Sequence, residues 1–199
     1  MTKYNVRRRF FLFLLAAISI SLSAQNFSAD REMFDAYKRE DMTVWKAYID
    51  SHQPSGSSHQ ILLYEYGYCG YIVAEDKEAA KPYVARFRAD VEASKGQLPI
   101  GHYEMYMSAV YVYELRLHQS FHPAKAMSMA KEATQLAPSD PLVLAYYGTS
   151  LYYAPKPFGS KKEALRYFER AAELFQGKEW QYCWVREASN MYIRLINNK

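Results

Sequence analysis

Three residues that could bind a metal ion follow one another at four-residue steps: Glu114, His118 and His122. On a continuous helix this spacing would place two imidazoles and a carboxylate on one face, and such ligands suit Zn²⁺. However, Pro123 follows His122, and the residue before a proline is biased out of the helical conformation. Because the third ligand then leaves the helix, we expect a polar helix end here and no metal site.

Motifs that carry catalysis or cofactor binding are absent from the 199 residues. The sequence contains no glycine-rich phosphate loop, no GxSxG nucleophile turn and no HExxH metalloprotease motif. It also lacks a carboxylate pair with a recognisable catalytic spacing. We therefore predict a protein that is not an enzyme, has no catalytic residue and needs no cofactor.

Aromatic residues are the main candidates for a binding surface, because the chain contains 19 tyrosines. Tyrosine offers a large contact area, few rotatable bonds and a hydroxyl group that can bond to a backbone amide. The same side chains at helical spacing also suit a helical core, and the sequence leaves this alternative open. The candidate binding residues are Tyr64, Tyr68, Tyr71, Tyr111, Tyr152, Tyr153 and Phe158.

The two cysteines, Cys69 and Cys183, lie in the first and last parts of the expected helical region. A disulfide needs Cα atoms within about 7 Å of each other. We expect these two helices to be far apart, so small buried apolar residues are the better interpretation. The sequence does not decide whether both thiols are free.

Residues 1–24 have the order of features of a secretory signal peptide. A basic segment ends at Arg9, an apolar run follows at 10–20, and small residues lead to Ala24, after which we place the cleavage site. The run is shorter than the ~20 apolar residues that cross a bilayer. We expect an exported protein without a membrane span after cleavage, periplasmic or secreted, from a Gram-negative bacterium.

The net charge of +4 comes from the same N-terminal segment. Four basic residues and no acidic residue lie in 1–24, and the chain from Gln25 onward is neutral. A neutral protein has little electrostatic attraction for a phosphate backbone. We therefore expect no nucleic-acid partner.

The rest of the chain has the periodicity of helices and no convincing strand pattern. We expect an N-terminal helix and linker at 25–58, helical repeats at 59–177 and a C-terminal capping helix at 178–199. Asp140 and Ser160 are suited to begin helices, the latter in a capping box with Glu163. The predicted helices are 30–50, 60–76, 77–95, 99–119, 123–136, 141–153, 161–176 and 178–197.

The two outer helices are expected to be continuous and amphipathic. In 30–50, the apolar stripe is interrupted once, at Asp41. In 178–197, the expected stripe contains Trp180, Trp184, Ala188, Met191 and Leu195.

Small and large residues recur in successive helix pairs. The second helices contain Ala79 and Tyr83, then Ala126, Ala130 and Ala133, then Ala164, Phe168 and Ala171. Two of the first helices place a large residue directly before glycine, at Tyr66-Gly67 and Tyr147-Gly148. Small residues at these positions let paired helices approach closely, and about three such pairs are needed for a stable stack.

This pattern resembles the tetratricopeptide repeat over about residues 60–176, with about three divergent copies. Arg86 and Glu114 stand where the family has small residues, and extra residues occur at 153–160. The resemblance implies an all-α fold: a short right-handed α-solenoid of helical hairpins with a single flanking helix at each end. A generic helical bundle is the alternative, because small residues serve close packing in all helical folds.

The family binds peptides or partner proteins in a concave groove lined by first helices. The resemblance therefore implies a protein-protein interaction module or scaffold with a tyrosine-rich groove, although fold-level likeness is a weak basis for function. The alternative is a small-ligand or carbohydrate-binding helical protein in which the same aromatic residues form a closed pocket.

Overall fold

The computed structural model describes residues 31–52, 59–119 and 122–198. The predicted signal peptide at 1–24 and most of the predicted linker, 53–58, lie outside these residues. The described residues form helices and contain no strand, as the sequence predicts. Contacts divide the chain into two units, Met1–Asp41 and Met42–Lys199, and each is described by itself.

In the first unit, a helix at 31–38 ends in a turn at 39–40. Glu40 has a φ of 59°, and the amide of Asp41 donates to the carbonyl oxygen of Ala36 at 2.9 Å. The next helix begins at Met42. The prediction of one continuous helix over 30–50 is therefore wrong, because a left-handed residue cannot continue a right-handed helix.

The second unit contains eight α-helices and one short 3₁₀ helix among its described residues. They are α2 (Met42–Ser51), α3 (His59–Glu75), α4 (Lys77–Ala93), α5 (His102–Arg116), α6 (Pro123–Leu136), α7 (Pro141–Tyr153), α8 (Lys161–Leu174), η1 (Lys178–Trp180) and α9 (Trp184–Asn197).

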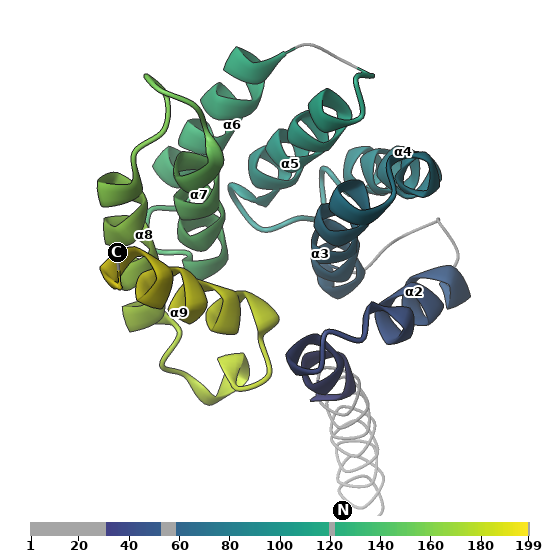
Figure 1. Cartoon of the computed structure of the whole chain (residues 1–199), viewed down its shortest axis with the longest axis horizontal. Coiled ribbons are helices and arrows are strands. Elements are labelled where there is room, and N and C mark those ends of the chain that lie inside the picture. The colour runs from purple at the N-terminus through teal and green to yellow at the C-terminus, as the bar shows by residue number, and fades with distance from the viewer. Residues whose placement is uncertain (1–30, 53–58, 120–121, 199) are drawn as a thin grey trace, which may run out of the picture. The chain divides into compact units, whose positions relative to one another are not determined.

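Consecutive helices pack as the pairs α3/α4, α5/α6 and α7/α8, and the pairs lie side by side in chain order (Figure 1). The first helices also contact one another, α3 against α5 and α5 against α7. This arrangement buries one face of every pair against its neighbour, which a single hairpin cannot do.

Local hydrogen bonds explain where several helices begin. The Asp140 carboxylate accepts from the amides of Leu142 and Val143 at 2.9 and 3.1 Å, as its predicted capping role requires. Ser160 Oγ accepts from the amide of Glu163 at 3.2 Å. The amide of Ser160 itself donates to the carbonyl oxygen of Leu151, so this loop is tied back to α7.

The second helix of every pair buries residues at the spacing i, i+4, i+7, which form the seam with the first helix. The predicted alanines of α6 and α8 are buried in these seams. In α4, however, the predicted Ala79 is exposed and Tyr83 only half-buried. The three buried seams are Ala80, Val84 and Phe87; Ala126, Ala130 and Ala133; and Ala164, Phe168 and Ala171.

The predicted repeat register in α4 is therefore wrong by one residue. This shift also moves Arg86 off the seam, so that its guanidinium reaches Glu65 at 2.8 Å. Glu114 likewise lies off the seam of α5 and accepts two hydrogen bonds from Arg88, each of 2.7 Å. The two departures from the family pattern are thus charged residues that join neighbouring helices.

The two glycines expected to permit close helix approach have different neighbours. A Cβ atom on Gly148 would lie 3.0 Å from the ring of Phe168, its partner across the α7/α8 seam. A Cβ atom on Gly67 would lie 2.5 Å from the ring of Trp45 on α2 and 2.8 Å from that of Trp184 on α9. Gly67 therefore makes room for two indole rings rather than for the paired helix α4.

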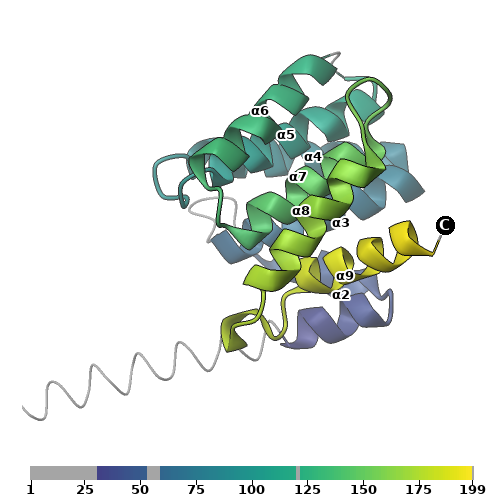
Figure 2. The ribbon, with the colours of Figure 1, turned by 90° about the vertical axis from the view of Figure 1, so that its left-hand side faces the viewer.

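The C-terminal region is not the continuous helix predicted for 178–197. η1 ends at Trp180, and α9 begins at Trp184. Within α9, Trp184 is buried as expected, but the predicted Met191 and Leu195 are exposed, and the buried face contains Trp184, Val185 and Ser189. The helix packs against α7 and α8, on the side of α8 away from α6 (Figure 2).

A search of the described residues for a helix both long enough and apolar enough to cross a membrane finds none.

Candidate interaction site

The predicted binding residues of α3 differ in their exposure. Tyr64 and Tyr68 are buried, with Tyr64 packing edge-on against Trp45 and Tyr68 against Tyr83. A partner could not reach them without opening α3. Their role in this structure is the alternative one, filling a helical core. Tyr71, by contrast, is 42% exposed and lies beside Tyr68.

Tyr111 lies elsewhere, between two cations. The Arg88 guanidinium is 5.2 Å from the centre of its ring, and the Lys125 ammonium is 4.6 Å from it. These contacts join α5 to α4 and α6. Cation–π contacts of this kind stabilise a helix junction, so Tyr111 is already engaged by its own chain.

The remaining predicted residues lie at the end of α7 or in the loop that follows it. Tyr153 is 64% exposed, and its hydroxyl lies 3.0 Å from that of Tyr192 on α9. The ring of Tyr152 lies 5.0 Å from the rings of both. Phe158, in the loop that follows, is 58% exposed. We call Tyr152, Tyr153, Phe158 and Tyr192 the α7–α9 edge.

Tyr192 was not predicted as a site residue. The sequence gives little indication of this role, because Tyr192 does not belong to the apolar stripe expected for a helix over 178–197. In the structure, its ring stacks on Phe168 of α8 with a centroid distance of 4.9 Å and an interplanar angle of 10°. Phe168 thus supports Tyr192 and, through it, the exposed Tyr153.

Other aromatic residues fill the interior between the first helices and α9. Tyr66 lies at the centre, and Tyr113 donates a hydrogen bond of 2.8 Å to its carbonyl oxygen. The hydroxyl of Tyr146 donates to Ser108 at 2.8 Å. The rings that contact Tyr66 are those of Tyr106, Tyr113, Tyr146 and Trp184, which together with it we call the aromatic cluster.

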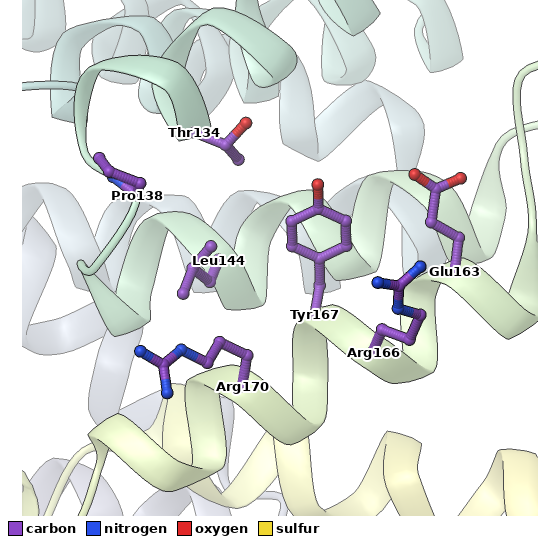
Figure 3. Close-up of a pocket in the computed structure, with 7 residues that line it drawn as sticks. All are labelled: Thr134, Pro138, Leu144, Glu163, Arg166, Tyr167 and Arg170. Atoms are coloured by element: carbon purple, nitrogen blue, oxygen red, sulfur yellow. The ribbon is translucent and has the colours of Figure 1, made fainter.

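A groove with a volume of about 480 Å³ lies between α6 and α8, above α7 (Figure 3). Arg166 and Arg170 extend from α8 on either side of Tyr167, whose hydroxyl points toward α6. None of these residues is predicted from the sequence to line a binding site, because long-range packing brings them together. The groove is lined by Thr134, Pro138, Leu144, Glu163, Arg166, Tyr167 and Arg170.

Three polar side chains form a hydrogen-bonded chain across the starts of α3, α5 and α7. His102 Nε2 lies 2.8 Å from Asp140 Oδ2, and His102 Nδ1 lies 2.7 Å from His59 Nε2. With Asp140 ionised and both imidazoles neutral, each of these contacts has one donor and one acceptor. His102 is buried, so its two partners fix its orientation.

The environment of this His59–His102–Asp140 chain disfavours extra protons. Burial, assisted by His102, lowers the pKa of His59 to about 4. Burial alone would raise the pKa of Asp140, but the hydrogen bond and charge of His102 and two backbone amides outweigh it and lower that pKa. Both shifts favour the unprotonated forms, the neutral imidazole of His59 and the carboxylate of Asp140.

A buried carboxyl pair joins α3 to α4. Glu65 and Asp90 are both buried, and Arg86 is within 2.8 Å of the first and 3.5 Å of the second. Burial, together with the charge of Asp90, raises the pKa of Glu65. One arginine is shared by two carboxyl groups here, so a proton on Glu65 removes the excess negative charge.

The residues considered for metal binding are not brought together. The carboxylate of Glu114 is engaged by Arg88, and His118 lies beyond the end of α5 with a φ of 58°. Within the described residues, no three metal-ligating side chains form a group that could bind an ion.

Cys69 and Cys183 are not joined by a disulfide, and Cys69 is buried as expected.

Comparisons with known proteins give no match: neither models of protein families, nor curated proteins, nor solved structures resemble this chain significantly.

Proposed function

We propose that the protein is a non-enzymatic binding module, exported from the cell, whose helix pairs stack as a short right-handed solenoid of the tetratricopeptide-repeat type. The three seams at the spacing i, i+4, i+7 support this arrangement. Export is supported by the basic and apolar segments of residues 1–24. The module binds a partner protein and performs no chemistry on it.

The observation that carries this proposal is the α7–α9 edge. Large aromatic side chains are normally covered, and a group of them at the surface marks an interaction site. Tyr153 and Phe158 are both more than half exposed, and Tyr153 contacts Tyr192, whose ring stacks on Phe168. Rigid aromatic residues lose little side-chain entropy on binding. A partner would place an apolar side chain against them.

The test is the double substitution Tyr153→Ala and Phe158→Ala. Affinity capture from the envelope fraction, with the captured protein identified and then purified, gives a defined partner for calorimetry. We expect the double variant to bind it at least about tenfold more weakly, because exposed aromatic residues are typical binding hot spots. Circular dichroism should be unchanged, since both side chains lie at the surface.

Ile100→Ala is the matched control, because Ile100 is exposed but lies in the connection between α4 and α5. This variant should bind like the wild type. Equal binding by the double variant and the wild type would show that the α7–α9 edge is not the interaction surface. A soluble glycan that competes for the edge would instead favour the carbohydrate-binding alternative.

A further inference from the structure

In Figure 2, α6 and α9 lie on opposite sides of α8, and the α6–α8 groove is on the side of α6. Phe168 faces Tyr192, whereas the next residue, Tyr167, lines the groove. Successive residues on a helix point about 100° apart, so α8 contributes to two separate surfaces. A ligand in the groove therefore need not contact the α7–α9 edge.

The two arginines of the groove differ in their partners. The guanidinium of Arg170 lies 2.7 Å from the carboxylate of Glu173, so its charge is balanced within α8. Arg166 is exposed and forms no ion pair with any residue in the described part of the chain. One wall of the groove thus carries a cation that a ligand can bind.

The floor and the opposite wall are less polar. Leu144 and Pro138 supply an apolar surface beside the arginines. The ring of Tyr167 packs edge-on against Tyr147, and its hydroxyl stands between the walls of the groove. This hydroxyl makes no hydrogen bond to the described residues, so it can bond to a backbone group of a ligand. At about 480 Å³, the groove has a volume in the range of sites that take a small ligand or a short peptide segment.

We propose that this groove binds an extended peptide segment in which an acidic side chain is next to an apolar one. The acidic side chain pairs with Arg166, which can donate two parallel hydrogen bonds to a carboxylate. The apolar neighbour packs on Leu144 and Pro138. A phosphate backbone fits less well, because Glu163 lies at the same groove and would repel a run of negative charges.

The first experiment selects peptides on the purified protein from a random-peptide phage library. We expect the enriched peptides to contain Asp or Glu beside an apolar residue. A fluorescently labelled enriched peptide and its Asn or Gln counterpart then serve as probes in anisotropy titrations. The acidic peptide should bind about tenfold or more tightly, and its affinity should fall as salt is raised.

Two variants test the assigned contacts. Arg166→Gln should weaken binding of the acidic peptide about tenfold, but should leave the affinity of the neutral counterpart almost unchanged. Glu163→Gln should strengthen binding of the acidic peptide, because it removes a repulsive charge. If these residues only stabilised α8, the two substitutions would not change peptide binding in opposite directions. Arg194→Gln on α9, outside the groove, is the control and should bind like the wild type.

Several outcomes would overturn the proposal. Enriched peptides without acidic residues, or equal binding by Arg166→Gln and the wild type, would show that no carboxylate is recognised. Displacement of the labelled peptide by a single-stranded oligonucleotide at equal concentration would indicate a nucleic-acid site. Failure of the library to yield any peptide sensitive to Tyr167→Ala would show that the groove does not bind peptides.

Discussion

At the scale of single residues, charged and polar side chains connect helices that are distant in the sequence. Arg86 and Glu114 break the repeat pattern in the sequence, yet in the structure each belongs to an ion pair between neighbouring helices. The His59–His102–Asp140 chain does the same for three helix starts. Residues that contradict a family pattern can therefore still support the same kind of packing.

His59 should make the free energy of unfolding of the protein depend on pH. Its pKa is lowered from 6.5 to about 4 in the folded state, so the unfolded chain binds the proton more readily. The contribution of His59 to the free energy of unfolding is therefore fully present above pH 6.5 and is lost as the pH falls toward 4. Relative to His59→Gln, which does not titrate, the wild type should lose about 2 kcal/mol between pH 7 and pH 5.

Urea unfolding of both proteins at a series of pH values measures this difference. Comparison with the variant is needed because Glu65 acts in the opposite direction: its raised pKa makes stability fall as the pH rises. If wild type and His59→Gln lose stability in parallel between pH 7 and pH 5, His59 is protonated in the folded protein and the assigned hydrogen-bonded chain is wrong.

At the scale of helices, small residues decide how closely neighbours approach. The seams of α4, α6 and α8 repeat the spacing i, i+4, i+7, although only α6 and α8 were placed in the correct register from the sequence. Ala79 and Ala80 are adjacent, and composition alone does not show which of them faces α3. Packing decides, because only the register with Ala80 also buries Val84 and Phe87.

Gly67→Ala should destabilise the protein more than an ordinary helix substitution. Alanine normally favours a helix over glycine, but here its methyl group would meet the rings of Trp45 and Trp184. We expect a net loss of about 1–3 kcal/mol, typical of overpacking, in thermal or urea unfolding. Gly96→Ala is the matched control, because nothing lies within 4 Å of the added Cβ atom. A variant at Gly67 as stable as this control would mean that the two rings move aside at no cost.

At the scale of the whole described fold, Trp184 connects the last helix of the second unit to its first helices. Its ring lies 5.4 Å from that of Trp45 and 5.6 Å from that of Tyr66. The aromatic cluster is thereby covered by the chain's own α9. Many of the tyrosines therefore serve the interior, and the surface keeps a smaller number for recognition.

Trp184→Ala should lower the free energy of unfolding by about 3–5 kcal/mol, because it leaves a large cavity beside Gly67 and Tyr66. Leu195→Ala, a change on the exposed side of the same helix, should cost much less. Differential scanning calorimetry of both variants measures the effect. Melting temperatures that fall equally in the two variants would show that α9 does not cover the aromatic cluster.

What the sequence by itself determined are the features that depend on near neighbours in the chain. The all-helical class, most helix boundaries, the caps at Asp140 and Ser160 and the alanine seams of α6 and α8 follow from periodicity and local hydrogen bonds. Predictions of helix boundaries fail where a single left-handed residue ends a helix, as at Glu40, or where a turn interrupts one, as before Trp184.

Only the tertiary structure decided which aromatic residues are buried and which are exposed. Tyr64 and Tyr153 are the same residue type in similar helices, but one faces Trp45 and the other faces solvent. The α6–α8 groove and the contact between Trp184 and Gly67 also join residues far apart in the sequence. Periodicity defines the face of a helix, whereas its neighbour in space is chosen by packing of the entire fold.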